Sequence, residues 1–142
     1  MTRTARSLRT STGPAARRTR PVGVLVVDDS LVFRTGMSRA VEACDGLELL
    51  GEAADGETAL RLVDELDPDL VILDLRMPGM DGFAVLEQLH AAGPPRCRVL
   101  VISATLDDGV GDEVMAAGAD GCLSKALSRA EICDTALRLA DG

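Results

Sequence analysis

The sequence has no hydrophobic run long enough to cross a membrane. Its longest apolar stretch, Val22 to Val27, leads straight into two aspartates, whereas a membrane-spanning helix needs about 20 apolar residues. The same shortness argues against a secretory signal. We therefore expect a soluble, cytoplasmic protein without a membrane partner.

Metal and redox motifs built on cysteine and histidine are also missing. The four cysteines include no C-x-x-C pair, and the single histidine, His90, has no neighbouring ligand at metal spacing. The thiols are expected to be free. His90 is expected to close a helix, where a cation or a hydrogen-bonding side chain suits the last carbonyls. A zinc site or a histidine-centred catalytic site is not expected.

Acidic residues are absent from residues 1–21, which carry six arginines, whereas the rest of the chain holds nine basic and 23 acidic residues. The segment is rich in Ser, Thr, Ala and Pro and lacks hydrophobic periodicity, which predicts a disordered basic tail. Binding to nucleic acid or acidic lipid, or a transit peptide, are the alternatives for such a segment. The acidic remainder argues against non-specific DNA binding by the folded part.

After the tail, strand-length apolar runs alternate with stretches of helical period. A chain of 142 residues with 46% hydrophobic positions is long enough for one compact domain, which we expect over residues 22–142. The alternation predicts a doubly wound α/β fold with a five-stranded parallel sheet and five helices. The expected strands are 24–27, 47–53 near a sheet edge, 70–73, 99–102 and 119–123. The expected helices are one that runs to about residue 43 with Ser30 as its N-cap, and then 57–66, 83–92, 107–117 and 128–140.

Residues suited to phosphoryl chemistry stand at the ends of four of these strands. They are Asp28 and Asp29, Asp74, Ser103 and Lys125. The carboxyl ends of parallel strands open into one crevice, so these side chains are expected to converge there. Oxygen ligands favour Mg²⁺, and a carboxylate beside Mg²⁺ can attack phosphorus to form an acyl phosphate. A hydroxyl and an ammonium can then contact the phosphoryl oxygens.

Four of these residues also have an ordinary structural interpretation. One aspartate of the Asp28 and Asp29 pair fits a helix cap while the other is solvated. Ser103 alone fits a satisfied strand-end hydroxyl, and Lys125 alone fits a surface lysine. Their common position at strand ends favours the phosphate site.

Four segments carry a family resemblance. VLVVDDS, PDLVILDLRMPGMDGFAVLEQL, VLVISAT and GADGCLSK, in this order and spacing, resemble the receiver domain of bacterial two-component response regulators over about residues 22–140. The resemblance implies the flavodoxin-like receiver fold. It also implies that Asp74 is phosphorylated by a partner, a sensor histidine kinase or a phosphotransfer protein.

The resemblance assigns further roles at the predicted site. The implied Mg²⁺ ligands are Asp28, Asp29, Asp74 and the backbone carbonyl of Arg76. Ser103 is implied to be the switch hydroxyl, and Lys125 to bind the phosphoryl group. Arg76 and Thr105 match the positions that tune how fast water reaches the acyl phosphate, so the long cationic Arg76 is expected to change the lifetime of the phosphoryl group.

One position departs from the family pattern. Three residues before the lysine the family generally has Tyr or Phe, and this chain has Cys122. Without an aromatic side chain there, the coupling of Asp74 to the surface formed by 107–117, 119–123 and 128–140 is expected to be altered. The ordinary interpretation of Cys122 is a thiol packed in the core.

The motifs GADG and SK, followed by a helix with Arg129, Glu131 and Leu137, look most similar to receivers of the nitrate-regulator subfamily. Members of that subfamily usually carry a C-terminal helix-turn-helix, which residues 1–142 do not include. The chain is therefore expected to be either a stand-alone receiver or the receiver part of a longer transcription factor, with DNA as a partner only through such an output domain. Receivers often dimerise, so a homodimer is a further expectation.

The leading hypothesis is a phosphorylation-gated signalling module and not a turnover enzyme. An aspartate-nucleophile phosphohydrolase uses similar carboxylates and Mg²⁺, but such enzymes typically need a second acid where this chain has Arg76. A module that binds its partner without phosphorylation is the third hypothesis, motivated by Cys122 and the missing output domain.

Overall fold

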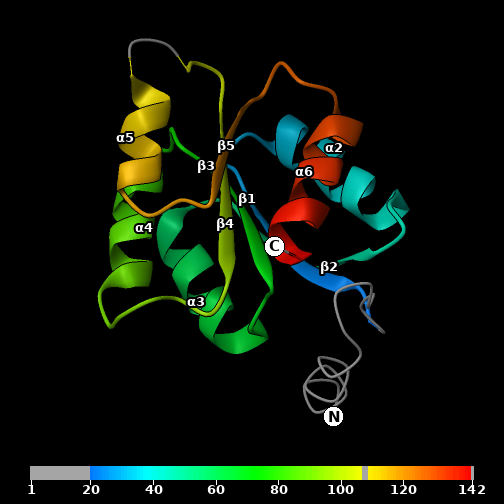
Figure 1. Ribbon diagram of the computed structural model, residues 1–142, viewed down its shortest axis with the longest axis horizontal. Helices are drawn as coiled ribbons and strands as arrows, with labels where there is room; N and C mark the ends of the chain where they lie inside the picture. The colour runs from blue at the N-terminus through cyan, green and yellow to red at the C-terminus, as the bar shows by residue number, and fades with distance from the viewer. Residues whose placement is uncertain (1–19, 107–108, 142) are drawn as a thin grey trace.

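The computed structural model describes residues 20–106 and 109–141, so the predicted tail, residues 1–21, lies outside it except for Arg20 and Pro21. One parallel sheet runs in the order β2-β1-β3-β4-β5 (Figure 1). The strands are β1 Val22–Val27, β2 Leu47–Ala53, β3 Leu70–Asp74, β4 Arg98–Ser103 and β5 Gly121–Ser124, and the helices are α2 Leu31–Ala43, α3 Gly56–Leu66, α4 Gly82–His90, α5 Val110–Ala116 and α6 Arg129–Asp141. The predicted five-stranded doubly wound fold and the edge position of β2 are confirmed.

Helices cover both faces of the sheet, and two separate apolar cores result. Val24 and Val26 of β1 point to the side of α2 and α6, while Leu25 and Val27 point to the side of α3, α4 and α5. Successive side chains of a strand face opposite sides, so a strand that is covered twice must be apolar throughout. This explains why β1 and β3 read as continuous hydrophobic runs.

The chain reverses its direction of winding between β1 and β3. From β1 it passes through α2 to β2 at one edge, whereas from β3 it passes through α4 and β4 toward β5 at the other. The loops after β1 and β3 therefore diverge and leave a crevice outside the carboxyl ends of these strands. The predicted site residues lie at this end of the sheet.

Side-chain caps fix the starts of the helices that follow the crevice. The Ser30 hydroxyl accepts a hydrogen bond from the Phe33 N–H at 3.3 Å, and the Asp81 carboxylate accepts one from the Ala84 N–H at 3.0 Å. Such caps satisfy backbone donors that have no partner inside the helix. The predicted cap at Ser30 is confirmed.

The helix expected at 107–117 and the strand expected at 119–123 differ most from observation. The expected start, Asp107, lies outside the described residues, and α5 begins at Val110 after Gly109, whose φ is 81°. Strand β5 begins at Gly121 because the Ala119 N–H still bonds to the Val114 carbonyl of α5 at 3.3 Å. These are shifts of element ends and leave the order unchanged.

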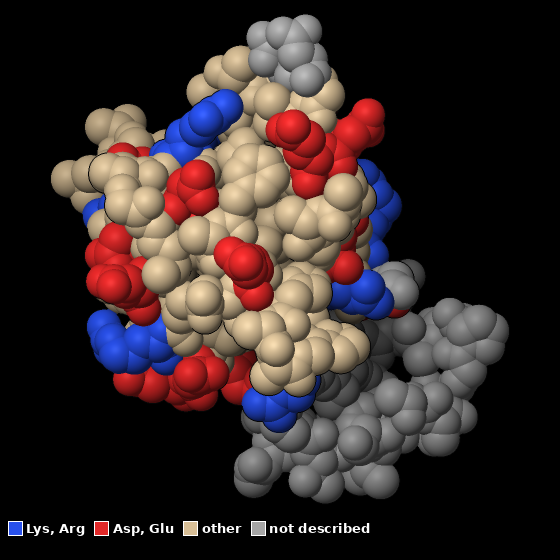
Figure 2. All heavy atoms as spheres, turned by 90° about the vertical axis from the view of Figure 1, so that its left-hand side faces the viewer, with Lys and Arg blue, Asp and Glu red and all other residues tan. Residues whose placement is uncertain are grey.

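The outer side of α4 and α5 is mixed in character. Figure 2 shows acidic side chains set among uncharged surface there. Leu106 and Met115 are the large apolar residues exposed near this side, at 36% and 46%. Within residues 20–106 and 109–141, no helix has the length and apolar character needed to cross a bilayer.

Candidate functional site

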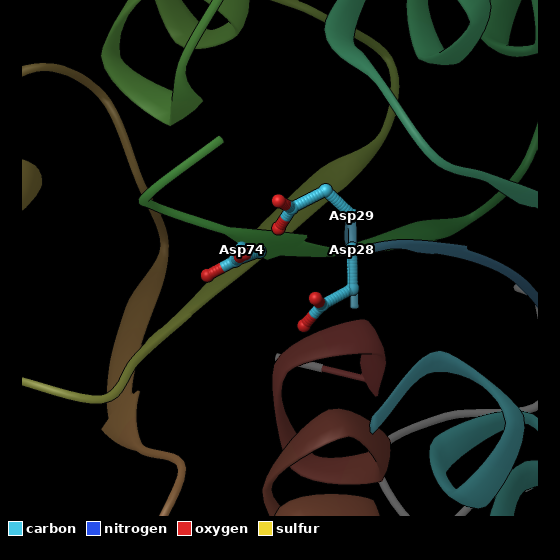
Figure 3. Close-up of side chains that lie close together, drawn as sticks. All are labelled: Asp28, Asp29 and Asp74. Atoms are coloured by element: carbon cyan, nitrogen blue, oxygen red, sulfur yellow. The ribbon is translucent and has the colours of Figure 1, made fainter. Parts of the chain in front are cut away.

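Three carboxylates meet at the carboxyl end of the sheet. Asp28 and Asp29 follow β1, and Asp74 is the last residue of β3. One oxygen of each lies within 4.8 Å of the others, and Figure 3 shows the three carboxylates turned toward a common space. Asp28 and Asp74 are 0% and 2% exposed, whereas Asp29 is open to solvent. The predicted convergence of these three residues is confirmed.

Lys125, which follows β5, brings a positive charge to the same place. Its Nζ lies 2.8 Å from Asp28 Oδ2 and 3.4 Å from Asp74 Oδ1. The Lys125 backbone N–H donates to the Ser103 carbonyl at 2.9 Å, so the loop that carries the lysine is tied to the end of β4. One ammonium therefore faces two buried carboxylates.

The crowding of negative charge shows in the protonation of Asp74. Burial, followed by the charge of Asp28, raises the pKa of the Asp74 carboxyl to about 6, while Lys125 and the Arg76 N–H oppose the shift. Removing a carboxylate from water and placing another beside it both favour the protonated form. The site is short of positive charge.

The cluster fits a hard divalent cation. Asp28 Oδ1 accepts a hydrogen bond from the Ser30 N–H at 2.8 Å. Asp28 Oδ2 is buried and faces the ammonium of Lys125 at 2.8 Å. Three carboxylates that share one ammonium offer the hard oxygen ligands that suit Mg²⁺. We conclude that Asp28, Asp29 and Asp74 have the chemistry to hold this ion.

Ser103 lies at the same strand end, but its hydroxyl is engaged elsewhere. It is 0% exposed, donates to the Thr105 carbonyl at 2.9 Å and lies 3.2 Å from the Thr105 N–H, which donates to it. The structure thus places Ser103 at the site without bonding it to Asp74. Its proton must leave the Thr105 carbonyl before it can serve another acceptor.

The loop after Asp74 is held at both ends by backbone contacts. The Arg76 N–H donates to Asp74 Oδ1 at 3.4 Å, and the Gly82 N–H donates to the Leu75 carbonyl at 2.9 Å. A Cβ on Gly82 would stand 2.8 Å from the Leu75 Cα, so only glycine allows this approach. The side chain of Arg76 points outward and is exposed.

Two residues of α2 that sequence reasoning missed also belong to the site. Arg34 donates to the Asp28 carbonyl at 2.7 Å and to the Glu52 carboxylate at 3.1 Å, which fixes the end of β1. The ring centroid of Phe33 lies 4.6 Å from Lys125 Nζ. Their position in the turn after the aspartates was the available signal, but nothing local marks their partners.

Cys122 packs partly buried against the core on the side of α3, α4 and α5. Burial raises the pKa of its thiol. The ordinary interpretation, a packed thiol, agrees with this position. His90 is also as expected, since it ends α4 and its Nδ1 lies 2.9 Å from the Leu86 carbonyl.

Comparison with known proteins identifies the class to which this fold and site belong. The family model for the response regulator receiver domain matches residues 24–137. The chain belongs to this family of regulatory receiver domains in two-component signalling. The expected resemblance to receivers of the nitrate-regulator type is confirmed.

Relatives and solved structures agree with this assignment. The transcriptional regulatory protein LiaR of Bacillus subtilis is 38% identical over 120 residues, which are 84% of this chain and 56% of that protein. The signal receiver domain of a response regulator, NarL, from Mycobacterium tuberculosis has a TM-score of 0.82 and 38% identity, with 87% of this chain and 98% of that chain covered. A chain of the CheX–CheY–BeF3–Mg²⁺ complex from Borrelia burgdorferi has a TM-score of 0.76 and 29% identity, with 84% and 90% covered. The chain thus spans about half the length of LiaR, the full-length relative described above.

Proposed function

We propose that this chain is the phosphoacceptor unit of a two-component system and that Asp74 takes the phosphoryl group. The observation that supports this best is the surroundings of Asp74. It is buried at the end of β3, within 4.8 Å of the Asp28 and Asp29 oxygens and 3.4 Å from Lys125 Nζ. A carboxylate held in this way is poised for attack on phosphorus once the repulsion between anions is offset.

The proposed donor is the phosphohistidine of a sensor histidine kinase or a phosphotransfer protein. An Asp74 oxygen forms the new P–O bond with its lone pair, the P–N bond breaks, and the imidazole leaves with that electron pair and takes up a proton. Lys125 contacts one phosphoryl oxygen as a point charge. Ser103 gives up its bond to the Thr105 carbonyl and donates to another oxygen.

Mg²⁺ is the proposed cofactor, held by Asp28, Asp29, Asp74 and the backbone carbonyl of Arg76. When bound, the ion offsets the repulsion between the carboxylates and the phosphoryl oxygens. Support comes from the oxygen-only donor set and from the closeness of the three carboxylates, which share one ammonium. The similar chain from Borrelia burgdorferi, whose complex contains BeF3 and Mg²⁺, adds further support.

In this proposal the phosphorylated chain itself carries the signal, and no small molecule is turned over and released. The position two residues after Asp74 is Arg76, an exposed cation that cannot serve as the acid of a phosphohydrolase. The proposed consequence is a change in the population of two surface states, because phosphate adds charge and acceptor oxygens at one end of the sheet. We take residues 22–142 as the receiver unit and place it in the cytoplasm. A second copy of the chain is a further proposed partner, in a homodimer. DNA is a partner only through an output domain outside these residues.

Intact-mass measurement tests the assignment. Incubation of the chain with Mg²⁺ and an acyl phosphate as donor is expected to add one phosphoryl group to the wild type and none to Asp74→Asn. Asp64→Asn, a change at an exposed carboxylate of α3, is the matched control and should label like the wild type. Equal labelling of Asp74→Asn would remove Asp74 from this role.

A further inference from the structure

The ring of Phe33 lies beside two cations, one of which belongs to the proposed phosphate site. Its centroid is 4.6 Å from Lys125 Nζ and 4.7 Å from Arg129 Cζ. Phe33 stands in the first turn of α2, Lys125 follows β5, and Arg129 is the first residue of α6. The ring therefore joins the acidic crevice to the first turn of α6.

Arg129 sits in a place shaped for its guanidinium. A Cβ on Gly36, one turn after Phe33 on the same face of α2, would stand 2.6 Å from Arg129 Nη2. Arg129 Nε is buried and has no hydrogen-bond partner among the residues that the structure describes. The guanidinium is thus held by packing on α2 and by the aromatic ring. A substitution of Gly36 would displace it.

Lys125 is held from two sides. Asp28 and Asp74 attract it with charge at 2.8 and 3.4 Å, and the Phe33 ring attracts it through its electron-rich face. Both Lys125 and Arg129 carry a positive charge and occupy the same ring, so each weakens the hold of the other. Any change that draws Lys125 away from the ring strengthens the contact of Arg129 with it.

From this arrangement we infer that Phe33 is a positioning residue for Lys125 and couples the phosphorylation site to α6 through Arg129. The inference rests on the proposed function. A phosphoryl group carries about −1.5 to −2 charges at neutral pH, more than the carboxylate it replaces, and draws Lys125 from the ring. Arg129 then settles on Phe33, and the first turn of α6 becomes harder to open. This route does not use the side chain at Cys122.

Hydrogen exchange at the start of α6 reads out the coupling. The Ile132 N–H bonds to the Ser128 carbonyl, and Ser128 and Glu131 form a reciprocal cap at 3.0 and 3.1 Å. In the wild-type chain, labelling of Asp74 by an acyl phosphate and Mg²⁺ is expected to slow exchange of the Ile132 amide by about two- to tenfold, within the range of a cation–π contact.

Substitutions separate the two roles of the ring. Phe33→Leu is expected to lower the rate of labelling by about two- to tenfold and to abolish the slowing of Ile132 amide exchange on labelling. Phe33→Tyr keeps an aromatic ring and is expected to keep both at the wild-type level. Arg129→Gln leaves the Phe33 ring to Lys125 alone, so it should label no more slowly than the wild type and should lose only the Ile132 response. Phe83→Leu, the same change at an aromatic residue on the opposite face of the sheet, is the matched control and should behave like the wild type.

The outcomes distinguish this inference from the function on which it rests. A Phe33→Leu chain that labels at the wild-type rate and keeps the Ile132 response overturns the inference and leaves Asp74 as phosphoacceptor. Equal loss of Ile132 protection with and without the label would show a purely structural role and also overturns it. Absence of label on the wild type overturns the proposed function itself.

Discussion

The buried carboxylates at the two ends of strand β3 have opposite electrostatic surroundings. At the amino end, Asp69 is 7% exposed, and Arg20 donates to both of its oxygens at 3.1 Å. The Gly23 N–H adds a third hydrogen bond at 2.8 Å. A planar guanidinium that bonds both oxygens is the strongest kind of ion pair available to a carboxylate. The charge at this end is balanced.

At the carboxyl end the balance is reversed. Asp28, Asp29 and Asp74 gather near the single ammonium of Lys125, and the pKa of Asp74 is raised as a result. The comparison teaches that burial of charge serves two purposes in one fold. At the amino end it holds the chain together, and at the carboxyl end it leaves a surplus of negative charge that suits a bound cation.

The largest expected effect is at the balanced end. Asp69→Ala leaves the Arg20 guanidinium and the Gly23 N–H without their carboxylate, and we expect a loss of about 3 kcal/mol in the free energy of unfolding. Urea denaturation measures it. Asp64→Ala, at an exposed carboxylate, should change the same quantity by less than about 0.5 kcal/mol. Equal effects of the two substitutions would contradict this contrast between buried and exposed carboxylates.

Mg²⁺ should stabilise the protein through the carboxylates at the carboxyl end of β3, and this gain should not depend on Asp69 at the amino end. At a concentration about 100 times its dissociation constant, the ion is expected to add about 2.7 kcal/mol to the free energy of unfolding. Thermal unfolding with and without Mg²⁺ measures this gain. Asp28→Asn should lose most of it, whereas Asp69→Asn should keep it despite its lower stability. A gain of equal size in Asp28→Asn would place the ion elsewhere.

Without divalent ions, removing charge from the crowded end should stabilise the protein. In the folded protein the pKa of Asp74 is raised to about 6, above the value near 3.8 expected for the unfolded chain. The stability that comes with the protonated carboxyl is therefore fully present below pH 3.8 and is lost as pH rises through about 6. Asp74→Asn is therefore expected to be more stable than the wild type by about 1–2 kcal/mol at pH 7, after allowance for relaxation and water.

The pH dependence checks this sign. The difference in melting temperature between Asp74→Asn and the wild type should open as pH rises from about 4 to 8 and should close in acid. Addition of Mg²⁺ should narrow the gap at neutral pH. A difference that stays constant with pH would show that the substitution acts through packing and not through charge.

The smallest effect on the free energy of unfolding is expected at an exposed ion pair away from both ends of β3. Arg61 and Glu65 lie one turn apart on α3 at 3.5 Å, with side chains 60% and 54% exposed. Arg61→Ala should lower the free energy of unfolding by less than about 0.5 kcal/mol, because water screens such pairs. High salt should make even this difference disappear. A loss as large as that of Asp69→Ala would show that burial is not what sets these energies.

Much of the fold and the site could be predicted because the signals are local. Apolar runs buried on both faces mark β1 and β3, and a strand end followed by acidic residues marks the crevice. Parallel order then brings Asp28, Asp74 and Lys125 together without any knowledge of their contacts. The geometry of the predicted cluster follows from topology alone.

The remaining features depend on packing between distant segments. The pairing of Arg20 with Asp69 joins a segment expected to be disordered to the start of β3, and no periodic pattern marks it. The contact of Phe33 with Arg129 requires the close packing of α2 on α6. The hydroxyl of Ser103 bonds the Thr105 backbone, a local choice among several that strand position does not decide.

The tethered loop between Asp74 and Gly82 has a consequence for how receivers of this kind can be diversified. Its two ends are held by backbone bonds and by a contact that only glycine permits, so the outward side chain of Arg76 can be exchanged with little cost to the architecture. Under the proposed function, we expect that the lifetime of the phosphoryl group can be adjusted at this one exposed position, separately from folding.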